Sequence, residues 1–415
     1  MKLQFDCISE LGEPGLKFKE LFSCYWPSYN DWIESSKSVG FPDIETSQAA
    51  LKKYMPEMLP LYHKVCKLVN ANSTVERFLT GFQPPAYVSG CAQAVLVKNE
   101  IQLVRNYDYH PDLIEGTLLL SSWNGKKVIA ISDCLIGVLD GMNEDGLAIS
   151  LTFGGREIVG EGFGIPFIMR YILEFCSNVK EAVKALKRIP CHMAYNVTVV
   201  DKSGIFKTVF LSPDRSPVVT DAAFATNHQV EVDWHENAAH NQTIERSAFI
   251  SGLLDQEEID ANTLADAFLN KPLYNRRFSE GFGTLYTVDY RPLTGIAHLR
   301  WLGVDVQQSF DNFNEGSTLI NFDNLPVEST HHYAFTKIPS ESNKLVPEEN
   351  LIWGDSKIKK DENSKLESPL EKKIELDSKS REILAEYWFK LGQGFGKNKR
   401  NGISKAAIKK RYNIK

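Results

Sequence analysis

The chain has 415 residues, of which 43% are hydrophobic and 24% charged, and its formal net charge at pH 7 is -6. This length suits one large domain of about 300 residues with appendages, or two domains. The mildly acidic balance argues against nucleic-acid binding by the chain as a whole, and no uncharged apolar run is long enough to span a bilayer. Because the start lacks a secretory apolar core and the seven cysteines are irregularly spaced, we expect a cytoplasmic protein in a reducing compartment.

The first part of the chain is expected to be helical. Between residues 16 and 80, apolar side chains recur at spacings of three and four, and Pro56 and Pro60 interrupt the pattern. The stretch GFQPPAYVSG, residues 81–90, then concentrates glycine and proline, which end helices. We therefore predict a boundary after residue 90.

Strand patterns begin directly after this boundary, and the pair Asn124-Gly125 is the strongest turn signal among them. The elements expected in chain order are hairpins over 92–109, 116–133 and 135–153, helices over 164–176 and 178–189, strands over 195–201 and 204–211, helices over 243–254 and 262–270, and a hairpin over 283–302. This order lacks the βαβ rhythm of a parallel sheet. It predicts an α+β domain of mainly antiparallel sheets with helices on their outer faces.

The composition changes again near the C-terminus. Residues 336–380 mix both charges with few large apolar side chains, which predicts a solvated linker. The final segment, 381–415, ends in twenty residues with eight basic side chains and no acidic one. Such a tail can contact nucleic acid, anionic lipid or a partner, or it can be a solubilising end.

One of the seven cysteines differs from the others in its surroundings. Cys66, Cys134 and Cys176 lie in apolar stretches, where a free cysteine is ordinary packing. Cys91 instead follows Gly90 in the segment rich in helix breakers and opens the strand pattern. This position makes Cys91 the candidate nucleophile.

The first predicted hairpin returns Arg105 and Asp108 beside Cys91. A thiolate nucleophile needs a stabilising charge, a base, and donors for the oxyanion that it creates. The guanidinium can stabilise the thiolate, and the carboxylate can orient an amine or the guanidinium. Taken singly, each residue is equally compatible with a surface ion pair.

Five short motifs occur in a fixed order: GC at 90–91, VRNYDY at 104–109, DGMNEDGLAIS at 140–150, ATNHQ at 225–229 and IERSAF at 244–249. Together they resemble the cysteine N-terminal-nucleophile (Ntn) hydrolases. The nearest branch is the isopenicillin-N acyltransferase-like group, which is related to choloylglycine hydrolase, penicillin V acylase and acid ceramidase. The resemblance covers residues 55–301 and implies a four-layer αββα sandwich preceded by a helical propeptide.

Members of this family are made as precursors that cut themselves before the cysteine. The resemblance therefore implies cleavage between Gly90 and Cys91, with residues 1–90 as a propeptide or light chain that can remain bound and residues 91–335 as the catalytic domain. The freed α-amino group has a reference pKa of about 7.7–8.0, so it can act as a base at neutral pH, where an amide nitrogen cannot.

The resemblance also implies roles for single residues. Cys91 is the nucleophile, and Arg105 and Asp108 support it. Asn227 donates a hydrogen bond to the oxyanion, and Arg246 steadies the centre. Without the ordered set of motifs, the preferred interpretation of Asn227 is a turn-forming asparagine, and that of Arg246 is an arginine on a helix surface.

Two positions depart from the family pattern. Ala92 follows the cysteine where these families often have threonine or serine. Thr152 stands where related hydrolases often have an asparagine that binds the oxyanion, so either its hydroxyl or a backbone amide is the candidate second donor.

The motif HENAAH, residues 235–240, resembles a zinc-protease motif. Its histidines are five apart rather than four, so they do not share one face of a helix. We interpret the segment as a loop of hydrogen-bonded histidines, and we expect neither a metal nor an organic cofactor.

These observations predict a self-processing cysteine amidohydrolase or acyltransferase. It would cleave or transfer the acyl group of a small molecule, a linear non-peptide or short N-acyl amide, through a thioester on Cys91. Three alternatives stay open: an N-acyltransferase that uses acyl-coenzyme A, a catalytically silent binding protein with the same fold, and an enzyme whose Cys91 works without cleavage. Nothing in the sequence indicates the oligomeric state.

Overall fold

The computed structural model describes residues 1–36, 41–278 and 282–325. Every helix and hairpin predicted between residues 92 and 302 is present within these ranges. The predicted charged linker (336–380) and basic tail (381–415) lie outside the described residues.

The larger sheet has nine strands in the order β10-β9-β8-β7-β6-β5-β4-β1-β15. Their bounds are β1 Lys2–Glu10, β4 Thr117–Ser121, β5 Val128–Asp133, β6 Gly137–Asn143, β7 Leu147–Phe153, β8 Tyr195–Asp201, β9 Phe206–Ser212, β10 Arg215–Thr220 and β15 Gly316–Asn321. From β4 to β10 all neighbours pair antiparallel, as predicted, whereas β1 runs parallel to β4. The turn between β4 and β5 contains Gly125 with φ +95°, a conformation that glycine adopts at no steric cost.

The smaller sheet has six strands in the order β11-β2-β3-β12-β13-β14. Their bounds are β2 Gly90–Val97, β3 Ile101–Tyr109, β11 Phe224–Ala225, β12 Gly283–Arg291, β13 Ile296–Trp301 and β14 Val304–Ser309. The β2–β3 hairpin is the predicted one, and its register sets Cys91 opposite Tyr107 and Gly90 opposite Asp108. On the other side of β3, strand β12 places Thr284 opposite Asp108.

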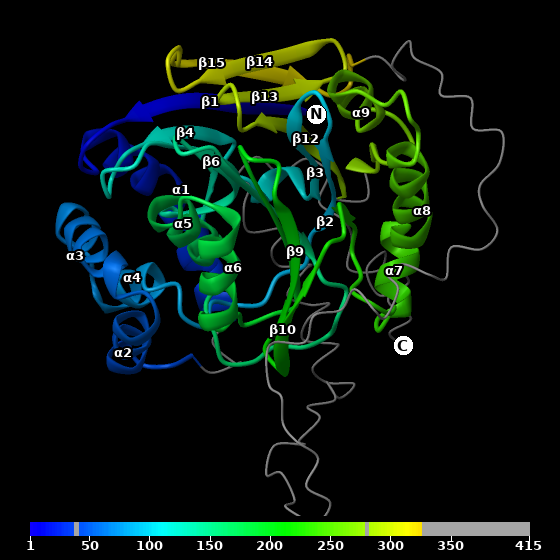
Figure 1. Cartoon of the computed structure of the whole chain (residues 1–415). Helices are drawn as coiled ribbons and strands as arrows, with labels where there is room; N and C mark the ends of the chain where they lie inside the picture. The colour runs from blue at the N-terminus through cyan, green and yellow to red at the C-terminus, as the bar shows by residue number, and fades with distance from the viewer. Residues whose placement is uncertain (37–40, 279–281, 326–415) are drawn as a thin grey trace, which may run out of the picture.

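The two sheets stack face to face, and helices cover their outer faces (Figure 1). Helices α5 (Ile165–Phe175) and α6 (Val179–Arg188) pack on the larger sheet, and α8 (Thr243–Leu254) and α9 (Ala261–Ala267) pack on the smaller one. Helix α6 is amphipathic and turns its alanines and Leu186 inward, which is what a helix covering a sheet requires. The αββα layering of mainly antiparallel sheets confirms the predicted fold class.

Alternation along β2 divides its side chains between two cores. Ala92, Ala94 and Leu96 pack under α8 and α9, whereas Cys91 and Val95 belong to the core between the sheets. Ala92 is fully buried there, so its small side chain serves the packing of the helices on the sheet.

A polar contact also crosses between the sheets. The side chain of Gln93 on β2 donates to the Thr198 hydroxyl at 2.8 Å and accepts from the Ser150 hydroxyl at 2.5 Å. Buried amides require such partners. These bonds fix β2, and with it Cys91, against β7 and β8 of the larger sheet.

The described residues before β2, 1–36 and 41–89, contain strand β1, four α-helices and a short 3-10 helix. Helices α1 (Leu16–Ser35), α2 (Ile44–Tyr54), α3 (Leu59–Leu68) and α4 (Ser73–Leu79) confirm the predicted helical character of residues 16–80. Strand β1 was not predicted, because its partners β4 and β15 lie more than 100 residues away in the sequence and no turn signal marks the pairing. It lies inside the larger sheet, between β4 and β15, so the N-terminal segment contributes a strand to the sandwich.

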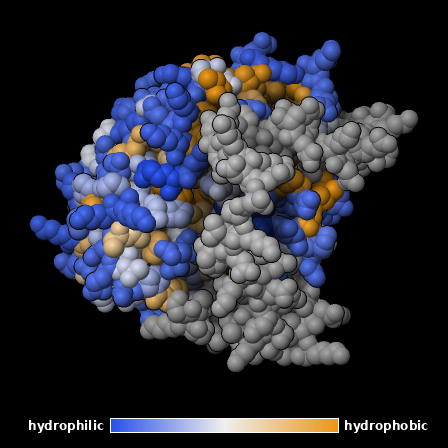
Figure 2. Space-filling view, turned by 60° about the horizontal axis from the view of Figure 1, so that its bottom comes forward, coloured by the Kyte–Doolittle hydropathy of each residue, from blue (hydrophilic) through white to orange (hydrophobic). Residues whose placement is uncertain are grey.

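The surface shown in Figure 2 is largely hydrophilic, with smaller hydrophobic areas. The exposed large apolar side chains come from separate elements, for example Leu16 on α1, Leu319 on β15 and Leu293 between β12 and β13. Among the helices of the described ranges, none combines the length and the apolar composition needed to cross a membrane.

The first prediction concerns the contribution of β1 to stability. Phe5 is 2% exposed, and its ring meets those of Trp301 and Tyr286 edge-on, with centroids 4.9 and 5.8 Å away. Phe5→Ala should lower the free energy of unfolding by about 3–5 kcal/mol, because it leaves a cavity between the sheets. The exposed neighbour variant Gln4→Ala should change it by less than about 0.5 kcal/mol. Denaturant unfolding followed by tryptophan fluorescence measures both, and equal midpoints would show that β1 does not stabilise the fold.

Candidate active site

Cys91 is the second residue of β2 and is fully buried between the sheets. The preceding residue, Gly90, has no room for a side chain, because neighbouring side chains lie too close to it. A Cβ atom on Gly90 would lie 2.2 Å from the ring of Phe282 and 3.1 Å from Cβ of Asp108. The absence of a side chain at Gly90 also leaves its carbonyl carbon open to the neighbouring sulfur.

The sulfur of Cys91 has two polar neighbours. Arg105 Nη2 donates to Sγ at 3.3 Å, and Ser89 Oγ lies 3.8 Å from it. Arg105 is itself fully buried. A guanidinium that donates to sulfur stabilises negative charge on it, which is the condition for a nucleophilic thiolate.

Arg105 is held in place by Asp140 of β6. Its Nη1 atom forms an ion pair with Asp140 Oδ2 and donates to the Leu139 carbonyl at 3.1 Å. Asp140 also accepts hydrogen bonds from the hydroxyls of Tyr286 at 2.6 Å and Tyr290 at 2.5 Å. Burial and the charge of Asp140 hold the pKa of both tyrosines well above its usual value, so both remain donors.

The opposite face of the β2–β3 hairpin carries a second buried ion pair. Arg246 of α8 donates through Nη1 to Asp108 Oδ2 at 3.0 Å and to the carbonyl oxygen of Cys91 at 3.1 Å. Thr284 of β12 donates to the other carboxylate oxygen at 2.6 Å. Burial raises the pKa of Asp108, while the charge of Arg246 and the bond from Thr284 oppose that shift.

Asn227 follows the short strand β11 and contacts the backbone of Cys91. Its Oδ1 accepts from the Cys91 nitrogen at 3.0 Å and from Arg246 Nη2 at 2.6 Å. Since a guanidinium only donates, this contact determines which end of the amide faces Cys91. Nδ2 donates to the Phe153 carbonyl at 3.2 Å, and an amide nitrogen has a second hydrogen beyond that bond.

Thr152 lies one residue before Phe153 but does not contact Cys91. Its hydroxyl donates to the Thr226 carbonyl at 2.8 Å and accepts from Asn196 at 3.0 Å. A hydroxyl has one hydrogen, and here the Thr226 carbonyl accepts it. Thr152 and Asn196 therefore hold residues 226–228, the segment that presents Asn227.

The histidine segment differs from the prediction. Residues 235–240 lie in the short helix α7 (His235–Asn241) rather than in a loop, consistent with the helix-favouring Ala238 and Ala239. Burial lowers the pKa of the nearby His228 to about 4, so it is neutral at physiological pH. Within the part of the chain that the structure describes, no three histidine, cysteine or acidic side chains are placed to hold a metal ion.

Five of the residues singled out from the sequence meet at one place: Cys91, Arg105, Asp108, Asn227 and Arg246. Their immediate supports were not predicted from the sequence: Asp140, Asn196, Thr284, Tyr286 and Tyr290. The spacing of four residues between Tyr286 and Tyr290 signals that the two tyrosines of β12 share one face, but only the stacking of the sheets shows what that face contacts.

A family model described as acyl-coenzyme A:6-aminopenicillanic acid acyl-transferase matches residues 95–303, half of the chain. The match begins just after Cys91 and includes the four residues that surround it. No curated protein sequence matches this chain.

Among solved structures, a mutant of the conjugated bile acid hydrolase from Clostridium perfringens is 16% identical with a TM-score of 0.35, over 59% of this chain and 97% of that one. Penicillin V acylase from Agrobacterium tumefaciens is 13% identical with a TM-score of 0.33, over 53% of this chain and 86% of that one.

The second prediction concerns the ion pair behind Cys91. Arg246→Gln would leave the Asp108 carboxylate buried without its cation, so the free energy of unfolding should fall by about 3–5 kcal/mol. Lys64→Gln removes a cation from the solvent-exposed pair with Glu13 and should change stability by at most about 1 kcal/mol. Denaturant titrations of the two variants give the comparison. Similar losses would mean that the Asp108–Arg246 pair does not stabilise the site more than a surface pair does.

Proposed function

Since the chain belongs to the acyl-coenzyme A:6-aminopenicillanic acid acyl-transferase family, we propose that it is a self-processing cysteine amidohydrolase or acyltransferase with Cys91 as its nucleophile. One observation carries this proposal. The sulfur of Cys91 accepts a hydrogen bond from Arg105, and its backbone nitrogen lies 3.0 Å from Asn227 Oδ1. A single residue thus supplies the nucleophile and a nitrogen that cleavage would convert into a base.

The first step would be cleavage of the chain before Cys91. The sulfur attacks the carbonyl carbon of Gly90, the bond from that carbon to the Cys91 nitrogen breaks, and the nitrogen takes the thiol proton. The product is a thioester between Gly90 and the Cys91 sulfur. Water then attacks the thioester, releasing a carboxylate on Gly90 and the free thiol, so all atoms are accounted for.

The mature site would then act on an external amide. The α-amino group of Cys91 takes the thiol proton, the sulfur attacks the substrate carbonyl, and the departing amine takes that proton as the acyl group forms a thioester. Asn227 Oδ1 orients the α-amine, and the second hydrogen on Nδ2 serves the oxyanion. Release to water makes the protein a hydrolase, and release to an acceptor amine makes it a transferase.

We assign Thr152 a positioning role in this scheme. Its hydroxyl hydrogen is engaged by Thr226, and its contact with Asn196 fixes the segment that carries Asn227. The substrate class that fits the scheme is a linear non-peptide or short N-acyl amide. The family description favours one variant, in which the acyl donor is a coenzyme A thioester and the acceptor an amine.

The third prediction tests self-processing. Intact mass under denaturing conditions should show two polypeptides, residues 1–90 and 91–415, because the Cys91 sulfur cleaves the preceding bond. Cys91→Ala should give one uncut chain. Cys134→Ala removes another buried cysteine and should still be cut. A single full-length mass for the unmodified chain would overturn self-processing and leave an uncut thiol enzyme or a silent binding protein.

The fourth prediction separates the two polar residues near the oxyanion. Among processed variants, Asn227→Ala should lower the rate of acyl transfer from an activated ester by about 10²–10³, the usual loss for an oxyanion donor. Thr152→Val keeps the shape of the side chain and should lower it by less than about tenfold, because its contact with the reaction is indirect. Single-turnover kinetics measures both, and the reverse order would make Thr152 the donor.

A further inference from the structure

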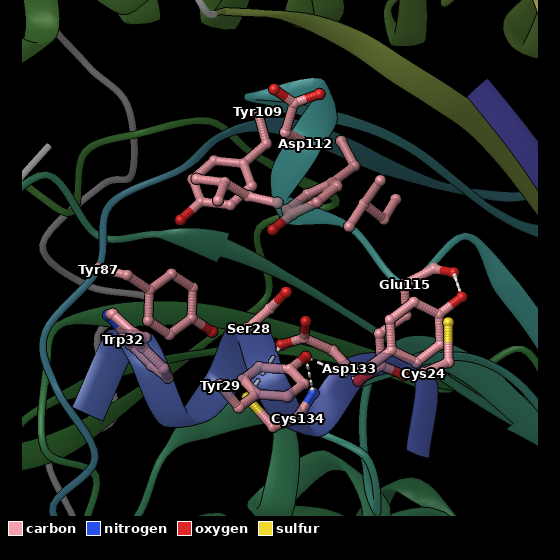
Figure 3. Close-up of a pocket in the computed structure, with 14 residues that line it drawn as sticks. Cys24, Ser28, Tyr29, Trp32, Tyr87, Tyr109, Asp112, Glu115, Asp133 and Cys134 are labelled. Carbon is pink, nitrogen blue, oxygen red and sulfur yellow. Dashed lines mark hydrogen bonds between the residues drawn. The ribbon is translucent and has the colours of Figure 1, made fainter. Parts of the chain in front are cut away.

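A cavity of about 260 Å³ lies next to α1 (Figure 3). Its walls include Trp32 of α1, Tyr87 of the segment before Cys91, and Tyr107 and Tyr109 of β3. Asp133, at the end of β5, also lines it. The cavity therefore combines residues from both sides of the expected cleavage point.

Tyr107 connects this cavity to the nucleophile. It stands opposite Cys91 in the β2–β3 ladder, so the two side chains lie on the same face of the hairpin. The Arg105 guanidinium lies 4.8 Å from the centre of the Tyr107 ring while it donates to the Cys91 sulfur. Tyr107 thus contacts both the cavity and the guanidinium that donates to the Cys91 sulfur.

The chemistry of the lining favours a cation. Six of the fourteen lining residues are tyrosine or tryptophan. The carboxylates of Asp112, Glu115 and Asp133 are the charged groups in the wall, and no lysine, arginine or histidine is among the described lining residues. Faces of tyrosine and tryptophan attract ammonium groups, and carboxylates at short range add to the attraction. An anionic ligand would meet only repulsion from these groups.

The carboxylates of Glu115 and Asp133 differ in how many hydrogen bonds they accept from the described residues. Glu115 accepts from the Tyr29 hydroxyl at 2.7 Å, the Leu135 nitrogen at 2.8 Å and the Ser132 hydroxyl at 2.6 Å, which suits a structural role. Asp133 is 8% exposed, and its hydrogen-bond donor among the described residues is the neighbouring Cys134 thiol at 3.4 Å.

The charge of Arg105 and the contact with Cys134 offset the burial of Asp133 only in part. Burial, together with the charge of Glu115, raises the pKa of Asp133 to about 7. The Tyr87 hydroxyl, buried in the same wall, has no partner of hydrogen-bond geometry among the described residues. Figure 3 shows this hydroxyl and the Asp133 carboxylate pointing toward the space between α1 and Tyr109. An ammonium group there could donate hydrogen bonds to the Asp133 carboxylate and to the Tyr87 hydroxyl oxygen.

The uncut chain indicates which part of a substrate reaches the cavity. Tyr87 lies three residues before Gly90, so the acyl side of the bond before Cys91 runs from the cavity wall to the carbonyl that the sulfur would attack. After cleavage, an external acyl group would approach the sulfur along the same course.

We propose that the substrate is an amide whose acyl group carries an ammonium group, held between the Asp133 carboxylate and the aromatic wall of this cavity. This inference rests on the proposed function, because it takes Cys91 as the nucleophile. It also gives residues 1–90 a part in the mature enzyme, since Trp32 and Tyr87 belong to the segment that would be cut but retained through β1.

The fifth prediction is a binding test that needs no catalysis. Calorimetry on Cys91→Ala should show that phenylethylammonium binds about tenfold or more tightly than 2-phenylethanol, its uncharged counterpart, because of the aromatic wall and Asp133. Adding Asp133→Asn should remove most of this preference. Adding Asp311→Asn, which removes the same charge from an exposed position, should leave it unchanged. Equal binding of the two probes to Cys91→Ala itself would overturn the proposal even if Asp133→Asn failed to fold.

A kinetic test locates the charge on the substrate. The wild-type enzyme should cleave 5-aminopentanoyl 4-nitroanilide with a higher kcat/KM than hexanoyl 4-nitroanilide, which has the same chain length without the charge. Asp133→Asn should lose this preference through KM. A preference only for an ammonium on the amine side, as in hexanoyl 4-(aminomethyl)anilide, would contradict the assignment to the acyl group.

The outcomes of the two tests separate this inference from the proposed function. If the amides are cleaved without preference for charge, the ammonium site is overturned and the amidase stands. If Cys91→Ala binds phenylethylammonium through Asp133 but the wild type neither cleaves an amide nor forms a thioester, the cavity stands as a cation site and the catalytic proposal is overturned.

Discussion

Two buried arginines on opposite faces of one hairpin determine the geometry around Cys91. A guanidinium that is out of water must be paired, or the fold loses several kcal/mol. Arg105 meets this requirement with Asp140 of the larger sheet, and Arg246 meets it with Asp108 of the smaller one. These ion pairs therefore hold β3, β6 and α8 together around Cys91. Each arginine also has a donor left for Cys91: Arg105 donates to its sulfur, and Arg246 donates to its carbonyl oxygen.

The same arrangement explains how one residue could serve both cleavage and catalysis. Before cleavage, Asn227 Oδ1 accepts from an amide nitrogen that has no basic lone pair. After cleavage, the nitrogen would be an amine at the same distance from the same acceptor, so no new site would have to form. Arg246 would keep the orientation of Asn227 in both states, because its own partner Asp108 belongs to the neighbouring strand and not to the segment that would be cut.

What the sequence predicts depends on how local the determining contacts are. The β2–β3 hairpin brings Arg105 and Asp108 to Cys91 within eighteen residues, so strand periodicity alone finds them. Asn227 and Arg246 reach the site through tertiary packing, and only the motif resemblance pointed to them. Strand β1 pairs with β15 across the whole described chain, and Asp140 acquires its role from the stacking of two sheets. Neither contact can be predicted from a short stretch of sequence, because the partners lie on segments that only the tertiary fold brings together.

If the aromatic cavity binds substrate, the position of β1 inside the larger sheet would serve the function of the protein as well as its stability. Cleavage of a precursor normally frees the released segment to diffuse away, and that would remove the wall made by α1 and Tyr87. A strand hydrogen-bonded on both edges, with Phe5 between the sheets, is the kind of anchor that noncovalent retention requires. Residues 1–90 would thus be cut from the chain but stay bound and help to recognise the acyl group. The segment that begins at Cys91 would perform the chemistry.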